Sequence, residues 1–275
     1  MPIYDAPVRH PLSGHVVVVT GASQGIGKAI CLELAPRSPR LVLAARDEGA
    51  LERVAGECRE RGAEALVVPT DVTSEEACRR LIERTVERFG GIDVLVANAG
   101  MSMWSRLDEV TDLGMYERLF RLNVLGCVYP VYFALSHLKR SKGRIVGVSS
   151  VAGMNGVPTR TGYSATKHAL FGFFDSLRIE LKGDGVSVTV AAPDFVLSEI
   201  HRRAAGPDGR PLGESPMQEG KIMSAEECAR RIVRAAARRD RLWIGSLRGR
   251  VGRFVKLLAP GVVDAIAAKA IRERR

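Results

Sequence analysis

Short apolar runs alternate with longer amphipathic stretches along this chain, and this alternation constrains the fold more than any other feature. Seven runs are rich in aliphatic and β-branched residues, which is typical of buried strands: residues 15–20, 41–45, 65–68, 92–97, 143–150, 186–191 and 242–244. Helical patterns separate them, at residues 28–35, 48–61, 74–89, 113–139, 163–181 and 225–239. Strands that alternate with helices form a parallel sheet with helices on both faces. We therefore predict a single α/β domain with a doubly wound parallel sheet.

Two segments depart from this rhythm. Residues 195–220 are rich in glycine and proline, and a long irregular segment after the carboxyl end of a strand predicts a lid over a ligand site. Beyond Gly245 the sequence is basic and amphipathic. From Arg230 to the end, fourteen Lys or Arg face three acidic residues, a balance of +11 in a chain whose total is +10. We expect a cofactor-binding domain at 1–245, lid included, and a basic helical extension at 246–275.

Cysteine usage and the N-terminus indicate the compartment. Five cysteines are scattered without a Cys-x-x-Cys pair, which favours reduced thiols over a disulfide framework or a zinc site. The first fourteen residues lack the apolar core of a signal peptide. No apolar run reaches the length of a membrane span. These features predict a cytoplasmic protein, and we expect no metal site and no nucleic-acid partner.

A glycine-rich turn joins the first strand to the first helix, and it reads Gly21-Ala22-Ser23-Gln24-Gly25-Ile26-Gly27. Glycines let the backbone approach a pyrophosphate, and the following helix offers free N–H groups and its positive dipole end. Glycines also serve ordinary turns. The position of this turn between a strand and a helix favours the phosphate-binding interpretation.

Tyr163 and Lys167 are four residues apart, so on a helix they share one face. A free phenol ionises near pH 10, and a nearby ammonium stabilises the phenolate, which suits a tyrosine that releases a proton near neutral pH. Such a pair usually marks only an exposed helix face. The apolar run ending in Ser149 and Ser150, together with the glycine turn, indicates a nicotinamide-dependent oxidoreductase.

Several motifs, in this order, resemble those of the short-chain dehydrogenases/reductases: Thr20-Gly21-x-x-x-Gly25-Ile26-Gly27, Asn98-Ala99-Gly100, Asn123, Ser150 and Tyr163-x-x-x-Lys167. The likeness covers roughly residues 16–244. Within that family the chain is similar to the 11β-hydroxysteroid dehydrogenase branch, and its ending resembles that of the dehydrogenase/reductase member 7B group. The resemblance implies a Rossmann-like fold.

The resemblance also implies roles for four residues. Tyr163 would be the general acid/base, and Lys167 would assist it and bind the nicotinamide ribose. Ser150, thirteen positions before the tyrosine, would polarise the substrate carbonyl, and Asn123 would hold a water that connects Lys167 to solvent. Hydride transfer to a carbonyl builds negative charge on oxygen, so donors at that oxygen stabilise it. The cofactor supplies the redox chemistry, while the protein orients the reactants and supplies the proton.

The resemblance assigns cofactor contacts to Gly21, Ser23, Gln24, Gly25, Ile26, Gly27, Arg46, Asp71, Val72, Asn98, Ala99, Gly100, Tyr163, Lys167, Pro193, Val196 and Ser198. An acidic residue at the tip of the second strand selects NAD, whereas an arginine accommodates the 2′-phosphate of NADP. Here Arg46 follows that strand and Asp47 falls late. We predict NADP rather than NAD, with Ser23 as a second phosphate contact; Gln24, where many NADP-dependent members are basic, argues the other way.

One motif departs from the family pattern. After the sixth strand the family usually has Pro-Gly-x-Val-x-Thr, and this chain has Pro193-Asp194-Phe195-Val196-Leu197-Ser198. Ser198 can still bond the nicotinamide amide. A carboxylate at Asp194, close to the carbonyl site, predicts narrower substrate choice or reduced activity. Flexible apolar residues flank the expected substrate loops and suit an irregular apolar ligand, although core or interface packing explains each of them nearly as well: Met101, Met103, Trp104, Met154, Val157, Met217 and Met223.

These features predict NADP-dependent reduction of an apolar ketone or aldehyde, or the reverse alcohol oxidation. One alternative is a 3-oxoacyl thioester reductase, whose acidic carrier protein would meet the basic tail. Another is a catalytically idle NADP-binding sensor or partner protein, for which only Asp194 argues.

Two kinds of assembly are expected. Helices 113–139 and 163–181 carry apolar residues on more than one face, and the resemblance implies that they pair in a homodimer or homotetramer. In the tail, an apolar stripe edged by cations is typical of a helix at a membrane interface, which predicts peripheral contact with an anionic membrane. Packing of that stripe on the protein itself is the competing interpretation.

Overall fold

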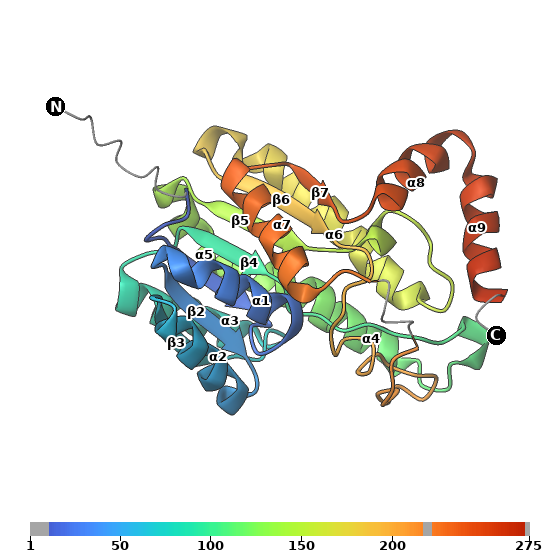
Figure 1. Ribbon diagram of the computed structural model, residues 1–275, viewed down its shortest axis with the longest axis horizontal. Coiled ribbons are helices and arrows are strands. Elements are labelled where there is room, and N and C mark those ends of the chain that lie inside the picture. Colours follow the sequence, from blue (N-terminus) through green and yellow to red (C-terminus); the bar gives the residue numbers. More distant parts are fainter. Residues whose placement is uncertain (1–10, 217–221, 273–275) are drawn as a thin grey trace.

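Seven parallel strands form one sheet in the order β3-β2-β1-β4-β5-β6-β7 (Figure 1). The computed structural model describes residues 11–216 and 222–272. The strands are β1 (Val16–Thr20), β2 (Arg40–Ala45), β3 (Glu64–Pro69), β4 (Val94–Ala97), β5 (Arg144–Val148), β6 (Ser187–Ala192) and β7 (Leu242–Ile244). The strand order reverses between β1 and β4, and doubly wound sheets bind ligands at the carboxyl ends of the strands at such a reversal. The predicted doubly wound parallel sheet is confirmed.

Helices cover both faces of the sheet (Figure 1). One apolar core lies under α1 (Gly25–Leu34), α2 (Glu48–Glu60) and α7 (Ala225–Arg238). The other lies under α3 (Glu75–Phe89), α5 (Gly126–Ser141) and α6 (Thr161–Glu180). Every residue of β1 is buried, as expected for a strand covered on both faces.

The five cysteines are buried and free, and each belongs to a different helix. The helices and their thiols are α1 with Cys31, α2 with Cys58, α3 with Cys78, α5 with Cys127 and α7 with Cys228. Small apolar thiols suit the tight packing between helix and sheet. In the described structure these cysteines therefore act as core residues.

The predicted helix at 113–139 is interrupted. It consists of α4 (Gly114–Phe120), a π-helical turn (Arg121–Leu125) and α5. By length and composition residues 114–141 qualify as a candidate membrane span, with a mean hydropathy of 1.4, which differs from the expectation that no run reaches this length. The apolar side of α5 packs into the core with its buried residues Cys127, Val131, Ala134 and Leu138. A core helix of a globular domain passes the same test of length and composition.

Residues 195–216 form no helix or strand, as predicted, and lie against the loop after β4. Isolated bridges join Ala205 to Met103 and to Pro211, and Val196 to Met223. Trp104 N–H donates to the Ala205 carbonyl at 2.8 Å. The remainder of the predicted lid, including Met217, lies outside the described residues.

After β7 the chain continues into α8 (Leu247–Leu258) and α9 (Pro260–Arg272), which stand at one end of the molecule in Figure 1. Ser246 caps α8 by accepting a hydrogen bond from Gly249 N–H. Five large apolar side chains of α8 are mostly exposed: Leu247, Val251, Phe254, Leu257 and Leu258. The apolar stripe predicted in the tail therefore does not pack on the rest of the chain through these residues.

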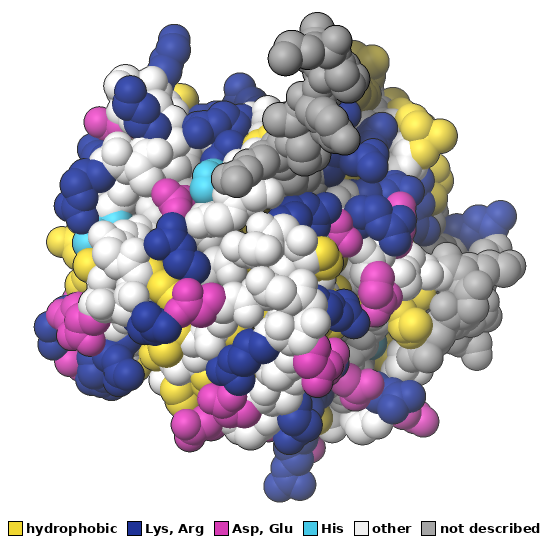
Figure 2. All heavy atoms as spheres, turned by 60° about the vertical axis from the view of Figure 1, so that its left-hand side comes forward, with side chains coloured by type: hydrophobic (Ala, Val, Ile, Leu, Met, Phe, Trp, Pro, Cys, Tyr) yellow, Lys and Arg dark blue, Asp and Glu magenta, His cyan; other side chains and the backbone are white. Residues whose placement is uncertain are grey.

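Charges of both signs are interspersed on the face shown in Figure 2, which brings the left-hand side of Figure 1 forward. Ion pairs occur along α2 and α3, such as Arg59–Glu52 and Arg79–Glu83. Exposed pairs of this kind contribute little to stability. Because acidic and basic side chains lie next to one another, this face presents no large area of a single charge sign.

Candidate active site

The candidate residues follow the carboxyl ends of four neighbouring strands. The glycine turn follows β1, Asn98 follows β4, Ser150 lies just beyond β5, and Pro193 follows β6. Since the strands are parallel, these ends lie along one edge of the sheet. The fold thus brings together residues that are up to 172 positions apart, from Gly21 to Pro193.

The glycine turn has the shape of a phosphate cradle. Gly21 and Gly25 have φ values of +65° and +53°, a region that side chains disfavour. A Cβ on Gly27 would lie 2.2 Å from the Gly21 carbonyl oxygen, so α1 can start this close to β1 only with glycine there. Gln24, the N-cap of α1, makes no side-chain cap. The first N–H groups of α1 remain available to an anion, and the turn fits a dinucleotide pyrophosphate.

Thr20 fastens the end of β4 to this turn. Its buried Oγ1 accepts hydrogen bonds from the N–H groups of Asn98 and Ala99, at 3.0 and 3.1 Å. Asn98 Nδ2 donates to the carbonyls of Thr20 and Gly21, at 2.9 and 3.3 Å. The sequence motif included Thr20 but gave it no role, because its hydroxyl bonds a residue 78 positions away.

Asn123 lies in the π-helical turn between α4 and α5 and is 1% exposed. Its Oδ1 accepts from Met101 N–H at 2.8 Å, and its Nδ2 donates to the Met101 carbonyl and to Thr166 Oγ1, both at 3.0 Å. The amide therefore joins the loop after β4 to α6. Single π turns often mark functional sites, and this one fixes Asn123 between the two segments.

Tyr163 and Lys167 lie in the first two turns of α6 and are 7% and 5% exposed. Lys167 Nζ is 5.6 Å from the centroid of the Tyr163 ring and donates to the Val148 carbonyl at 3.0 Å. The helix α6 therefore brings the two predicted residues together in a buried setting.

The two serines after β5 have different surroundings. Ser149 is buried, and its Oγ donates to the Lys167 carbonyl at 3.0 Å, which ties β5 to α6. Ser150 Oγ accepts from Ala152 N–H at 3.1 Å and contacts the Pro193 carbonyl at 3.4 Å. Because Ser149 is committed to a buried structural bond, this geometry favours Ser150 as the serine that faces substrate.

The adenosine end of the expected cofactor site contains Arg46, Asp47 and Ser23. Arg46 is exposed and forms no ion pair with another described residue. Asp47 caps α2, with Oδ1 accepting from Ala50 N–H at 2.9 Å. The carboxylate nearest the tip of β2 is thus engaged with the helix. Ser23 is half-buried in the glycine turn.

The remaining predicted cofactor residues border the same edge. Asp71 Oδ1 accepts from Thr73 N–H at 2.9 Å, and Val72 is buried against Gly126 of α5. A Cβ on Gly25 would lie 3.3 Å from the Ser198 Cβ, so the segment after β6 reaches over the glycine turn. Ile26 lies in the first turn of α1, and Gly100 follows β4. Pro193 and Val196 follow β6, and Val196 is 4% exposed.

The substrate side contains a small apolar cluster around Tyr163, formed with Met103, Met115, Leu119, Ala152 and Ala205. Met103 is fully buried, and its Sδ accepts from Gly162 N–H at 3.2 Å, so it is a core residue. Met101 and Val157 are only partly buried against the cluster.

Arg160 is a feature of this region that sequence reasoning missed. It is 5% exposed, and its guanidinium lies 4.5 Å from the centroid of Trp104, 5.1 Å from that of Phe195 and 5.9 Å from that of Tyr163. Cations pack favourably over aromatic faces. A single arginine three residues before the tyrosine carries no pattern, so only the fold reveals this contact.

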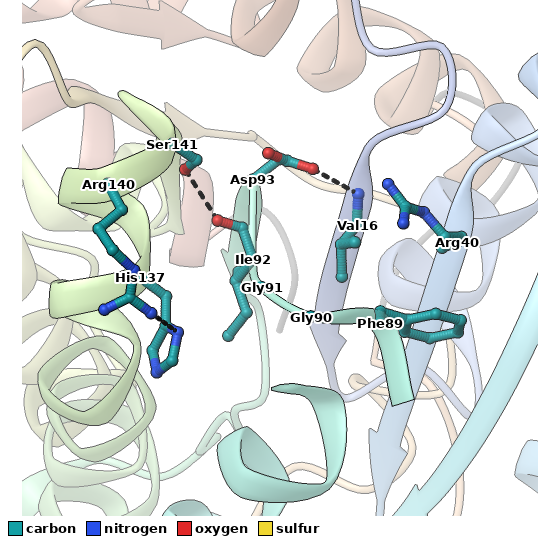
Figure 3. Close-up of a pocket in the computed structure, with 10 residues that line it drawn as sticks. All are labelled: Val16, Arg40, Phe89, Gly90, Gly91, Ile92, Asp93, His137, Arg140 and Ser141. Carbon is teal, nitrogen blue, oxygen red and sulfur yellow. Dashed lines mark hydrogen bonds between the residues drawn. The ribbon is translucent and has the colours of Figure 1, made fainter. Parts of the chain in front are cut away.

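A cavity of about 310 Å³ lies at the opposite end of the sheet, where β1 and β4 begin (Figure 3). Its polar groups are engaged in structural bonds: Asp93 Oδ2 accepts from Val16 N–H at 2.8 Å, and Ser141 Oγ donates to the Ile92 carbonyl at 2.8 Å. Burial, followed by the charge of Arg140, lowers the pKa of His137. Within residues 11–216 and 222–272, no group of three His, Cys, Asp or Glu side chains is arranged to hold a metal ion.

Comparison with known proteins identifies the class. The profile of the short chain dehydrogenase family matches residues 15–207. "11-beta-hydroxysteroid dehydrogenase A" of Sesamum indicum is 38% identical over 259 residues, which cover 92% of this chain and 74% of that protein. "Dehydrogenase/reductase SDR family protein 7-like" of Dictyostelium discoideum is 31% identical, over 92% of this chain and 81% of that protein.

Two solved structures have a fold similar to that of this chain. A short-chain dehydrogenase/reductase of Burkholderia phymatum in complex with NAD is 26% identical, covers 92% of this chain and 96% of its own, and has a TM-score of 0.80. An alcohol dehydrogenase of the archaeon Thermococcus sibiricus complexed with 5-hydroxy-NADP is 30% identical, over 80% and 88% of the two chains, with a TM-score of 0.69.

The chain belongs to the short-chain dehydrogenase/reductase family. More particularly, it is a member of the branch that contains the 11β-hydroxysteroid dehydrogenases, and it is an oxidoreductase acting on CH–OH and C=O groups with a nicotinamide dinucleotide cofactor.

Proposed function

We propose that this enzyme transfers hydride between NADP(H) and an apolar ketone or aldehyde, or the corresponding alcohol, with Tyr163 as general acid/base. The observation that carries the proposal is the buried Tyr163–Lys167 pair, which lies beside the Ser150 turn at the same sheet edge as the glycine cradle. The nicotinamide cofactor, when bound, supplies the hydride or accepts it.

The chain's own residues would perform the remaining tasks. Ser150 Oγ would donate to the substrate oxygen and stabilise the charge that develops there. The Tyr163 hydroxyl would deliver the proton to that oxygen, or remove it in the oxidative direction. Lys167 would stabilise the phenolate by its charge. Asn123 would hold the loop after β4 against α6, and in the family pattern also a water that connects Lys167 to solvent.

The preference for NADP rests on charge at the tip of β2. Asp47 is directed at the N-terminus of α2, and Arg46 is exposed beside it. An arginine here suits a 2′-phosphate, whereas NAD-dependent enzymes place a carboxylate on the ribose hydroxyls. One of the two solved relatives was bound to NAD and the other to an NADP derivative, so the proposal depends on Arg46 itself.

The apolar substrate class rests on the partly buried Met101 and Val157 beside Tyr163 and on the names of the relatives. The decisive experiment is a screen of steroids, retinoids, long-chain ketones and acyl thioesters with NADPH. Turnover is measured as the loss of NADPH absorbance. Turnover of an apolar ketone or aldehyde is expected. Turnover of acyl thioesters alone would favour the thioester reductase, and cofactor binding without any turnover would favour an idle NADP-binding protein.

Assembly gives a separate prediction. Tyr132 on α5 and Ile179 on α6 are 70% and 74% exposed, whereas Val131 and Phe174 are buried in the core and are not available to a partner. Exposed apolar side chains on these helices suit pairing between copies. We expect light scattering at micromolar concentration to give at least twice the 29.8 kDa of one chain. A mass of one chain would rule this pairing out.

The amphipathic tail gives another prediction. Leu247, Val251, Phe254 and Leu258 are exposed, and α8 also carries four cations: Arg248, Arg250, Arg253 and Lys256. We propose that this surface contacts an anionic membrane. Arg248 and Lys256 contact Asp194 and the Met154 carbonyl, so Arg250 and Arg253 would be the main cations at the leaflet. Each cation near an anionic leaflet contributes about 1 kcal/mol, weakened by salt.

We expect the full-length protein to sediment with anionic vesicles at low salt and to be released at high salt. The Phe254→Ser/Leu258→Ser variant should lose this binding while keeping its cofactor affinity, because it alters only exposed side chains. Deletion of residues 245–275 should abolish it. If the intact protein stays in solution with anionic vesicles, the tail has no membrane role.

A further inference from the structure

The carboxylate of Asp194 is directed at the C-terminal extension. Its Oδ2 accepts hydrogen bonds from Arg248 Nε and Ser246 Oγ, both at 2.6 Å, and its Oδ1 accepts from Arg248 Nη2 at 2.8 Å. The backbone N–H of Phe195 also donates to Oδ1, at 3.0 Å. A bidentate contact between a guanidinium and a carboxylate fixes the orientation of both groups as well as pairing their charges. The carboxylate expected to crowd the substrate is therefore engaged by α8.

Burial and charge indicate that this contact is held firmly. The Asp194 side chain is 15% exposed, while that of Arg248 is 66% exposed. Burial alone raises the pKa of the Asp194 carboxyl, but the hydrogen bonds from Arg248 and Ser246 outweigh it and hold the pKa below the usual range. The carboxylate is therefore ionised near neutral pH and remains available to both donors.

Ser246 and Arg248 connect Asp194 to the first turn of α8. Ser246 Oγ accepts from Gly249 N–H at 3.1 Å, so the same hydroxyl caps α8 and donates to Asp194. The Arg248 guanidinium lies 5.3 Å from the centroid of the Phe195 ring, a second contact between α8 and the segment after β6. The start of α8 is thus fixed to the residues that follow Pro193.

On its other side this segment contacts the Ser150 turn. The Pro193 carbonyl accepts from Val151 N–H at 2.9 Å and lies 3.4 Å from Ser150 Oγ. The helix α8 lies against the same turn, since a Cβ on Gly249 would be 2.9 Å from Val151 Cγ2. Further along α8, Lys256 Nζ donates to the Met154 carbonyl at 2.8 Å. The extension therefore covers the turn that carries Ser150.

The backbone at Asp194 does not require glycine. Among the described residues, positive φ outside glycine occurs at Ser38, Lys142, Thr159 and Arg239, and not at Asp194. A side chain here introduces no backbone strain, so the departure from the glycine of the family pattern adds a contact without distorting the turn.

We propose that Asp194 is a positioning residue that latches α8 onto the Ser150 turn, so that the C-terminal helix forms one wall of the substrate site. The kinetic part of this inference rests on the proposed function. With the latch released, α8 can move away from Val151 and Met154, and an apolar substrate loses part of its enclosing surface. The hydride and proton transfer groups stay in place, so substrate binding should change more than the chemical step.

The latch itself can be tested without turnover. Limited trypsin digestion of the full chain, with NADPH present, should cut at Arg250, Arg253 and Lys256 of α8, and mass spectrometry gives the rate at each site. In Asp194→Gly we expect cleavage there to be at least about fivefold faster than in the wild type, because opening of α8 no longer breaks the charged contact. Asp194→Asn should fall between the two.

The matched control is Asp175→Asn, which removes an acid that pairs with Arg178 and Arg241 away from the Ser150 turn. It should leave cleavage in α8 unchanged. Equal cleavage rates in Asp194→Gly and wild type would overturn the latch. That result is independent of activity, so it differs from failure of the proposed function, which would appear as absent turnover in the wild type.

Kinetics with an apolar carbonyl substrate test the consequence. Asp194→Asn and Arg248→Met should each raise KM about tenfold, the scale of a lost charge-assisted hydrogen bond, with kcat within about threefold of the wild type. The double variant should add little to either single change, because both break one contact. Additive effects, or a fall in kcat with KM unchanged, would contradict the positioning role of Asp194.

Discussion

The Tyr163→Phe variant is expected to lose at least about a hundredfold in kcat, the lower limit typical of a general acid or base. The substitution removes only the hydroxyl and keeps the ring in its apolar cluster with Met103 and Ala205. The fold should therefore persist, and NADPH affinity, measured by fluorescence titration, should be nearly unchanged. Steady-state turnover on the best substrate from the screen gives the comparison.

Tyr116→Phe is the matched control for this experiment. The Tyr116 hydroxyl lies 2.7 Å from Thr161 Oγ1 at the start of α6, so the control removes a hydrogen-bonded phenol at the same end of the helix. It should keep kcat within a few-fold of the wild type. Turnover of Tyr163→Phe at the level of this control would reject Tyr163 as the proton donor.

The Arg46→Ala variant should bind NADPH about ten- to a hundredfold more weakly, and NADH almost as before. A hydrogen bond to a charged group contributes about 1.5–3 kcal/mol, and Arg46 is the cation at the tip of β2 that can meet a 2′-phosphate. Titration of both cofactors by fluorescence gives the two dissociation constants, and their ratio is the quantity of interest.

Arg53→Ala controls for the loss of one positive charge, since Arg53 is exposed on α2 nearby. It should weaken NADPH binding by less than threefold at physiological salt, where charges that make no contact are largely screened. If Arg46→Ala weakens both cofactors equally, Arg46 does not recognise the 2′-phosphate and the preference for NADP loses its basis.

The sheet was predictable because its strands are buried on both faces. Continuous apolar runs such as residues 15–20 and 41–45 need no knowledge of their neighbours to be recognised. The structure places these strands at Val16–Thr20 and Arg40–Ala45, within a residue of the runs. The glycine turn was equally predictable from the sequence, because the close backbone approach at Gly27 tolerates no side chain and so requires glycine there.

Features that depend on contacts between distant segments could not be predicted in this way. The π-helical turn around Asn123 interrupts a stretch that has helical periodicity throughout, and its position depends on bonds to Met101 and Thr166. The carboxylate of Asp194 was expected to act on the substrate, but Arg248, 54 residues later, holds it. The roles of the site residues themselves remain predictions, which the variants above test.

Each buried thiol can report when the helix that carries it moves away from the sheet. Burial raises the pKa of each thiol, to about 11 for Cys58 and about 12 for Cys78, Cys127 and Cys228. The thiolate is the reactive form, so alkylating reagents can reach these groups only when the helix that carries them detaches from the sheet. Labelling followed by peptide mapping would time the opening of α1, α2, α3, α5 and α7 separately. The helix α6, which carries Tyr163 and Lys167, contains no cysteine. Its opening would therefore not be detected by thiol labelling, even when all five thiols are protected.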